Sequence, residues 1–108
     1  MYVYIAGPIT KGNQFLNCAN AIRVFGELIQ KGFYPYCPHL DFLAQMLVPE
    51  LSVKKHLLPL DRAWVERCDI VLRLPGKSPG SDLEVAHAKK CNIPVYYNTL
   101  EEFIKRYG

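Results

Sequence analysis

Four short, largely apolar runs, each followed by a segment that can form a helix, place the strongest limit on how this chain folds. The runs are Tyr2–Ala6, Phe33–Cys37, Asp69–Leu74 and Pro94–Tyr97. Such runs are typical of strands that are buried on both faces of a parallel sheet. Strands that alternate with helices therefore predict an α/β protein, in which helices cover both faces of a doubly wound parallel sheet of four to five strands, giving three layers.

Helices are expected between these runs and after the last one. Gly32 is expected to end the first helix, in which apolar residues recur at helical spacing: Phe15, Cys18, Ala19, Ile22, Phe25 and Ile29. Further helices are expected from about Pro59 to Cys68, from Ser81 to about Cys91, and after Thr99. The segment Asp41–Lys55 fits one or two short helices, and its length is typical of a lid or loop over a site.

The length and composition predict one globular domain, residues 1–108. The chain has 108 residues, of which 50% are hydrophobic and 21% are charged, and this leaves room for one core. Its net charge is +3, with scattered Lys and Arg; this can attract a small anion but does not favour binding to a nucleic acid polymer. A small domain buries a modest share of its surface, so we expect a homodimer or a higher homo-oligomer.

The cysteines and the start of the chain predict a cytoplasmic protein. Free buried thiols are the favoured interpretation, and a zinc site the less favoured one, because no CxxC spacing joins Cys18, Cys37, Cys68 and Cys91. No apolar stretch approaches the ~20 residues of a membrane span. The first strand pattern begins without a basic flank, so we expect no signal peptide.

The loops that follow the expected strands mark the place for a site. In doubly wound sheets, ligands bind outside the carboxyl ends of the strands, where the strand order reverses. The loops at these ends are Gly7–Asn13, Pro38–Asp41 and Pro75–Ser81. We expect the residues that bind and react with a ligand to converge there.

The stretch Ser78–Glu84 is the most informative part of these loops. A turn rich in glycine and serine follows a strand and opens a helix, which places Glu84 in the first helical turn. There the helix dipole favours an ionised carboxylate directed at the crevice, so Glu84 is a candidate nucleophile. The alternative is a capping box, in which Ser81 and Glu84 only hold the start of their own helix.

The loop Gly7–Asn13 has the GxxxxG spacing of a phosphate-binding loop without its chemistry. Asn13 and Gln14 stand where a nucleotide triphosphatase needs Lys and Ser or Thr, and no GxGxxG is present. Two interpretations remain open. The loop is either an anion-binding turn, with backbone N–H groups and Lys11 as donors, or a tight turn without a ligand.

Four further residues each have a structural and a functional interpretation. Asp61 is either an early-helix carboxylate favoured by the helix dipole or an acid of the site. Tyr4 is either a strand aromatic or a site residue, and His39 either faces solvent or belongs to the site at its strand end. Trp64 is expected to pack in the protein rather than to stack on a ligand.

Three motifs, in this order along the chain, resemble those of a known family. They are Tyr4–Thr10, Asp61–Val71 and Ser78–Glu84, the last followed by Ala86 and Ala88. Together they resemble the nucleoside 2-deoxyribosyltransferase family, which includes relatives that hydrolyse 2'-deoxynucleoside 5'-monophosphates. The resemblance covers most of the chain apart from Asp41–Lys55, and the expected fold is therefore flavodoxin-like or Rossmann-like.

The resemblance implies catalytic roles for three residues. Glu84 is expected to attack the anomeric carbon of the sugar, Tyr4 to orient Glu84, and Asp61 to protonate the leaving base, since it can hold a proton in a dry pocket beside Trp64. The family's hydrolases carry a serine at the position of Ser78, which meets the 5'-phosphate. The residues expected to bind the substrate are Gly7, Ile9, Lys11, His39, Ser78, Gly80 and Asp82.

The chain departs from the family pattern in two places. Asp82 stands where the family usually has glycine, so we expect it to narrow or charge the pocket beside Glu84. The family often completes its site with a residue from a neighbouring subunit near the C-terminus. Asn98 is one possibility for that residue here.

The expected function is an N-glycosidase that cleaves (2'-deoxy)nucleoside 5'-monophosphates into free base and sugar 5-phosphate. One alternative is a nucleoside 2-deoxyribosyltransferase that exchanges bases between deoxynucleosides. Another is a non-catalytic nucleotide-binding protein, and a flavoprotein is less favoured. The expected mechanism requires no metal and no organic cofactor.

Overall fold

Four parallel strands form one sheet in the computed structural model, which describes all 108 residues. The strands are β1 (Tyr2–Ala6), β2 (Tyr34–Tyr36), β3 (Ile70–Arg73) and β4 (Val95–Tyr97), in the order β2-β1-β3-β4. The predicted α/β fold with a four-stranded parallel sheet is confirmed, and this strand order is that of the flavodoxin-like fold. The order reverses between β1 and β3, which is where such folds bind their ligands.

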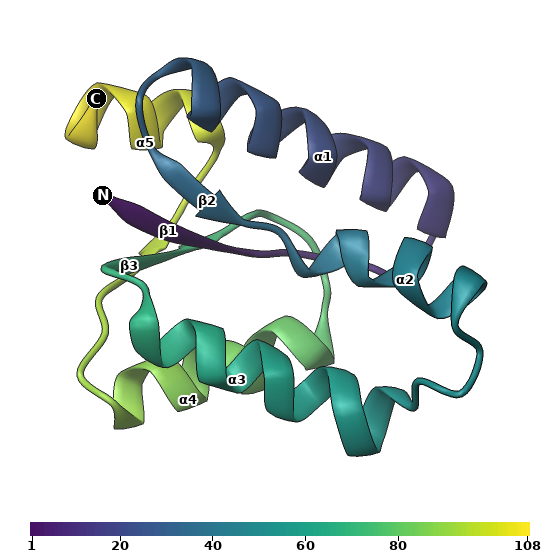
Figure 1. The fold of residues 1–108 in the computed structure, drawn as a ribbon. Helices are drawn as coiled ribbons and strands as arrows, with labels where there is room; N and C mark the ends of the chain where they lie inside the picture. Colours follow the sequence, from purple (N-terminus) through teal and green to yellow (C-terminus); the bar gives the residue numbers. More distant parts are fainter.

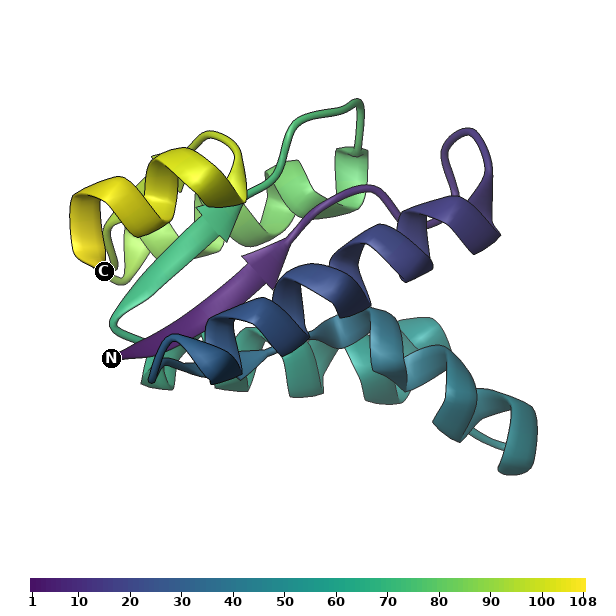
Figure 2. The same cartoon turned by 90° about the horizontal axis from the view of Figure 1, so that it is seen from above.

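Two helices cover each face of the sheet, which gives three layers (Figure 1). On one face lie α1 (Gln14–Gln30) and α5 (Leu100–Tyr107), and on the other lie α3 (Leu58–Arg67) and α4 (Pro79–Lys90). Figure 2 looks onto this face and shows α1 over one side of the sheet and α5 over the other. Because side chains alternate along a strand, β1 sends Val3 and Ile5 into the core beneath α1 and α5, and Tyr4 and Ala6 into the core beneath α3 and α4.

The apolar face predicted for α1 is only partly the buried one. Ala21 and Leu28 are buried, whereas Phe15 is 79% exposed and Ile29 is 50% exposed. The helix ends as expected before Gly32, which has a φ of +89°. Since α1 carries apolar residues on more than one side, helical spacing alone does not identify the side that meets the sheet.

The segment Asp41–Lys55 contains two short helical elements. A 3-10 turn, η1 (Pro38–Leu40), leads into α2 (Asp41–Leu47), and a π-helical turn, η2 (Val53–Leu57), leads directly into α3. This segment projects beyond the carboxyl end of the sheet, as Figure 1 shows at α2. Its two helical elements both border the cavity described below.

The loops that follow β1 and β3 pack against each other. Gly76 has a φ of +117°, and a Cβ atom at this position would lie 2.7 Å from Cγ of Pro8. The buried Arg73, at the end of β3, donates hydrogen bonds to the carbonyl oxygens of Leu74 and Gly76. The buried Arg73 side chain thus fixes the backbone of the loop after β3. Gly76, which has no side chain, allows this loop to approach Pro8.

The four cysteines are free thiols. Burial raises the pKa of both Cys37 and Cys68 to about 11, so these two thiols are protonated and poorly nucleophilic at neutral pH. None of the helices combines the length and the apolar character that crossing a membrane requires.

Candidate active site

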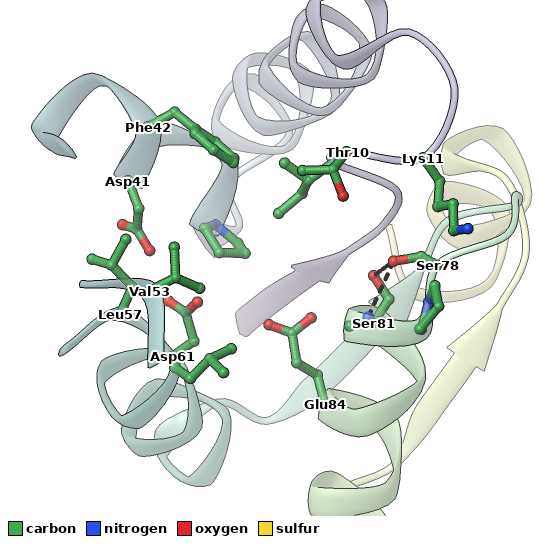
Figure 3. A pocket seen from close by; sticks show the side chains of 15 residues that line it. Thr10, Lys11, Asp41, Phe42, Val53, Leu57, Asp61, Ser78, Ser81 and Glu84 are labelled. Atoms are coloured by element: carbon green, nitrogen blue, oxygen red, sulfur yellow. Dashed lines mark hydrogen bonds between the residues drawn. The ribbon is translucent and has the colours of Figure 1, made fainter. Parts of the chain in front are cut away.

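A cavity of about 200 Å³ opens at the carboxyl end of the sheet, beside the point where the strand order reverses. Its walls come from the loop after β1, the start of α2, η2, the start of α3 and the start of α4. As predicted, all three loops at the strand ends contribute to it. Figure 3 shows Glu84 near the middle, Asp41 and Asp61 on one side, and Lys11 and Ser78 on the other. We call these sides the acid end (Asp41 and Asp61) and the loop end (Lys11, Ser78 and Gly80).

Glu84 lies in the second turn of its helix, not in the first as predicted. The helix α4 begins at Pro79, and Ser78 is its N-cap, with its hydroxyl oxygen accepting from the backbone N–H of Ser81 at 3.1 Å. Ser78, whose residue type caps helices well, thus starts the helix before Ser81. The Ser81 hydroxyl instead donates to the carbonyl oxygen of Gly7 at 2.9 Å. The capping-box interpretation of Ser81 and Glu84 is therefore wrong.

Glu84 of α4 is held in place by Tyr4, a residue of the sheet strand β1. The Tyr4 hydroxyl donates a hydrogen bond to Oε2 of Glu84, although the two residues are 80 positions apart. Tyr4 is fully buried on β1, and burial together with the nearby Glu84 and Asp61 carboxylates raises its pKa far above the ordinary value. A neutral tyrosine is therefore the permanent donor that fixes the Glu84 carboxyl group in the cavity.

Burial, rather than the helix dipole, controls the protonation of Glu84. Loss of water raises its pKa to about 7, and Asp41 adds to this rise, while the hydrogen bond from Tyr4 and the charge of Arg73 lower it. The prediction that Glu84 is held ionised by its helix start is wrong because Glu84 lies beyond the first turn, where the dipole acts. Near neutral pH the residue has both an ionised and a protonated population.

Asp61 is the buried acid of the opposite wall. It lies in the first turns of α3 and is only 7% exposed. Burial raises its pKa to about 8, and the neighbouring Asp41 carboxyl group and the charge of Glu84 act in the same direction. The expectation that Asp61 holds a proton in a dry pocket agrees with these surroundings, since a carboxyl group with this pKa is mostly neutral at pH 7.

A stack of three aromatic rings lies next to the carboxyl groups of Asp61 and Glu84. Trp64 stacks on Tyr36 with ring centroids 5.1 Å apart, and Tyr36 stacks on Tyr4 at 5.5 Å. The Tyr36 hydroxyl donates to Oδ1 of Asp61 at 3.2 Å. Trp64, which is 41% exposed, thus packs on a protein side chain rather than facing the cavity, as predicted. The stack places one tyrosine hydroxyl on each carboxyl group.

Four of the residues expected to bind the substrate line the cavity: Ile9, Lys11, Ser78 and Gly80. The Ser78 hydroxyl is bonded within the protein: it donates to Oγ of Ser81 at 2.8 Å and accepts from the N–H of the same residue. Lys11 is exposed, and Figure 3 shows its side chain beside Ser78. Lys11 is the one cationic side chain that lines the cavity.

Three of the predicted binding residues lie outside the cavity wall. Gly7 serves it only indirectly, through the carbonyl oxygen that accepts from Ser81. His39 is 2% exposed, and its Nε2 atom lies 3.1 Å from the carbonyl oxygen of Pro8 on the far side of the β1 loop. Asp82 does not line the cavity, and its exposed side chain forms an ion pair with Arg73 at 3.1 Å, contrary to the expectation that it narrows or charges the pocket.

Asn98 also lies apart from the cavity within its own chain. Its side-chain oxygen accepts from the N–H of Thr99 at 2.8 Å, and it borders a separate surface hollow with Arg73 and Asp82. Thr99 caps α5 as predicted, because its hydroxyl oxygen accepts from the N–H of Glu102.

Asp41 is the one ionisable residue of the cavity that the sequence did not single out. It is half-buried at the first position of α2, and its Oδ2 atom is buried without a hydrogen-bond partner. The one feature of the sequence that indicated a site residue here was the position of Asp41 in the Pro38–Asp41 loop, which follows a strand. No spacing in the sequence relates it to Asp61, which lies 20 positions later.

One group of side chains has ligand atoms close enough for a metal ion. Glu66 of α3 and His87 and Cys91 of α4 offer ligand atoms that all lie within 4.8 Å of one another. The His87 and Glu66 side chains already form a pair at 2.8 Å. None of the three lines the cavity, so this group is separate from the acids.

The fold and the cavity define a flavodoxin-like α/β protein with a carboxylate site at the switch point of its sheet. Residues 1–98 match the family described as a domain of unknown function, DUF7768, and the chain belongs to this family. No curated protein matches the chain.

A solved structure supports the assignment of the fold. The 2-deoxyribosyltransferase from the psychrotolerant bacterium Bacillus psychrosaccharolyticus is similar to this chain with a TM-score of 0.65 and 19% sequence identity. The similarity covers 88% of this chain and 69% of that protein. At this level of identity the likeness establishes the shared fold.

Proposed function

We propose that this protein is an enzyme that breaks the N-glycosidic bond of 2'-deoxynucleosides and transfers the sugar to a second base, with Glu84 as the nucleophile. The observation that carries the proposal is the placement of two carboxyl groups in one cavity: Glu84, held by the hydrogen bond from Tyr4, and the buried Asp61 on the opposite wall. The structural likeness to a 2-deoxyribosyltransferase, described as a biocatalyst for nucleoside synthesis, favours the same class of substrate.

In the first step, the ionised Glu84 attacks C1' of the sugar. An oxygen of Glu84 forms a bond to C1' while the bond from C1' to the base nitrogen breaks, and the electron pair of that bond remains on the base. Asp61 gives its proton to the leaving base, which departs neutral. Tyr4 keeps the Glu84 carboxyl group oriented through its hydrogen bond.

The second step reverses the first with a new acceptor. An incoming base attacks C1' through a ring nitrogen, its proton returns to Asp61, and Glu84 leaves as a carboxylate. If water attacks instead, its proton goes to Asp61, its hydroxyl goes to C1', and the product is free sugar. Transfer and hydrolysis therefore share the intermediate and the two acids, and they differ in the acceptor.

A second candidate function is hydrolysis of 2'-deoxynucleoside 5'-monophosphates, favoured by Lys11 at the loop end. A 5'-phosphate placed there would meet the Lys11 ammonium group and the N-terminus of α4, both of which favour an anion. The Ser78 hydroxyl has its proton directed to Ser81, so its part in this candidate is to build the helix start.

A chromatographic assay separates these candidates. The purified protein is incubated with a panel of 2'-deoxynucleosides, ribonucleosides and their 5'-monophosphates, with and without a second free base. New deoxynucleosides that contain the added base are the expected result. Sugar 5-phosphate formed from monophosphates, with no exchanged product, would establish the hydrolase instead.

The assay also tests the role of Glu84. The Glu84→Ala variant is expected to fold normally and to release no base, as measured by circular dichroism and chromatography. Base release equal to that of the unmodified protein would remove Glu84 from the mechanism. Binding of deoxynucleoside monophosphates in calorimetry, without release of base from any substrate, would identify a non-catalytic nucleotide-binding protein.

A further inference from the structure

We infer that Asp41 is a positioning residue of this site, whose carboxylate shares a proton with Asp61 and keeps that acid protonated until the base leaves. The role of Asp41 in turnover rests on the proposed function. The proton sharing itself is a property of the resting protein and can be measured without any substrate.

The unsatisfied oxygen of Asp41 is the first observation. Asp41 and Asp61 come from different helices, α2 and α3, and both line the acid end of the cavity (Figure 3). Oδ2 of Asp41 is buried, and no donor of the protein reaches it. A buried polar atom without a partner is costly. A proton carried by Asp61 supplies the missing hydrogen bond.

The surrounding charges are the second observation. Asp61 is faced by Asp41 from α2, by the Tyr36 hydroxyl from β2, and by Glu84 from α4, with Tyr4 of β1 beside Glu84. No cationic side chain lines the acid end, since Lys11 lies at the loop end and Arg73 acts on Glu84. Carboxylates this close, without a cation between them, do not all ionise together.

The difference in burial between the two aspartates places the shared proton on Asp61. Asp61 is 7% exposed whereas Asp41 is half-buried, so the negative charge is less costly on Asp41. Burial raises the pKa of both groups, and the neighbouring Asp41 raises that of Asp61 further. In the proposed pair, one proton and one negative charge are therefore shared, with Asp41 as the ionised member. The charge of Asp41 also raises the pKa of Glu84.

This arrangement suits an acid that must give up a proton and later recover it. When Asp61 protonates the leaving base, the acid end gains a second negative charge beside Asp41. That repulsion favours return of a proton from the incoming base or water in the second step. A catalytic acid works best with a pKa near the operating pH, and burial together with Asp41 brings the pKa of Asp61 into that range.

The first experiment is a carboxyl-carbon NMR titration of the resting protein labelled at aspartate. In the unmodified protein, the signals of Asp41 and Asp61 are expected to show coupled titrations, each responding to both protonation steps. Two independent single-step curves would overturn the inference. Because this measurement uses the unmodified protein, it does not depend on any variant that fails to fold.

Variants then isolate the contribution of Asp41. In Asp41→Asn, the midpoint of the Asp61 titration is expected to fall by about one pH unit or more, because a negative neighbour is lost. Asp41→Glu, which keeps the carboxyl group, is expected to retain most of the shift. The matched control Glu50→Gln removes an exposed acid from the neighbouring loop and is expected to leave the midpoint unchanged. An unchanged Asp61 midpoint in folded Asp41→Asn would overturn the inference.

Kinetics complete the test. Both limbs of the pH profile of kcat/KM are expected to move to lower pH in Asp41→Asn, since Asp41 raises the pKa of both acids. A purely structural role would reduce activity or stability without moving the limbs. If no substrate is turned over by the unmodified protein, the proposed function fails, while the NMR titration still decides whether the proton is shared.

Discussion

The loop end and the acid end of the cavity are built in different ways. The loop end joins two short strand-to-helix connections: Lys11 lies in the loop after β1, and Ser78 and Gly80 lie at the start of α4, which Ser78 caps. The acid end is assembled from the starts of α2 and α3, with the Tyr36 hydroxyl of β2 bonded to Asp61. The first holds an exposed cation, Lys11, and the second holds the buried Asp61 and the half-buried Asp41.

This difference suggests that the loop end binds the charged part of a substrate, whereas the acid end takes part in the reaction. An exposed lysine is screened by water and salt and contributes modestly to binding an anion. Buried carboxyl groups change their protonation strongly, since loss of water raises the pKa of both Asp61 and Glu84. Substitutions at the acid end and at Glu84 should therefore affect turnover, and those at the loop end should affect the binding of charged substrates.

The largest effect is expected from Glu84→Gln. The amide keeps the shape of the side chain but cannot form a glycosyl ester, so kcat/KM for base release should fall by about 10³-fold or more. The assay is initial-rate chromatography of the released base. Glu66→Gln, which removes an exposed carboxylate of α3, should stay within a factor of two or so of the unmodified protein. Equal losses in the two variants would contradict the assignment of Glu84.

Asp61→Asn should cost ~10²–10⁴-fold in kcat/KM, which is the usual worth of an acid catalyst. The unmodified enzyme should give a bell-shaped pH profile. Its activity rises through about pH 7 as Glu84 ionises and falls through about pH 8 as Asp61 loses its proton. The alkaline limb should disappear in Asp61→Asn. A profile that keeps this limb would assign it to another group.

The same substitution should raise stability at alkaline pH. Asp61 has a raised pKa in the folded protein, so its contribution is fully present below the unfolded pKa and is lost as pH rises through about 8. Asp61→Asn removes this loss. Its free energy of unfolding at pH 9, measured by urea titration, should exceed that of the unmodified protein by about 1 kcal/mol. A lower value at pH 9 would show that Asp61 is held by a compensating partner.

Tyr4→Phe should have a smaller effect, about tenfold on kcat/KM, because it removes one hydrogen bond to a charged group. That hydrogen bond lowers the pKa of Glu84, so its loss should move the acid limb of the profile to higher pH. The measurement is the pH dependence of base release. An acid limb that stays in place would mean that Tyr4 only packs.

The smallest effect is expected from Lys11→Met. The KM for 5'-monophosphates should rise by about threefold at low salt, while the KM for nucleosides stays constant, because only the phosphate meets the exposed ammonium group. Lys31→Met, at the exposed end of α1, is the charge-matched control. Equal changes for nucleosides and monophosphates would show that Lys11 does not mark a phosphate position.

The sequence predicted the parts of the molecule that local patterns control. Apolar runs located all four strands, and the loops at their carboxyl ends located the cavity. The order of Tyr4, Asp61 and Glu84 along the chain indicated residues that the fold does bring to one place, with Tyr4 bonded to Glu84. Each of these signals depends on neighbours in the sequence or on a motif already known.

The wrong predictions concern properties that tertiary packing determines: the position of a side chain, its pKa and its neighbours. Asp82 was expected in the pocket, but Arg73, from the end of β3, draws its carboxylate outward. The pKa of Glu84 depends on its burial by distant elements rather than on its helix position. Asp41 was missed because its relation to Asp61 exists only after the fold has brought the starts of α2 and α3 to one cavity.

The close contact between the loops after β1 and β3 requires a glycine at position 76. Its left-handed backbone and its contact with Pro8 mean that even a single methyl group at this position would push two neighbouring turns apart. In related chains, a glycine at this position together with a proline at position 8 therefore indicates, from the sequence alone, that the two loops are in contact. Relatives with a bulky residue at position 76 must connect these turns differently.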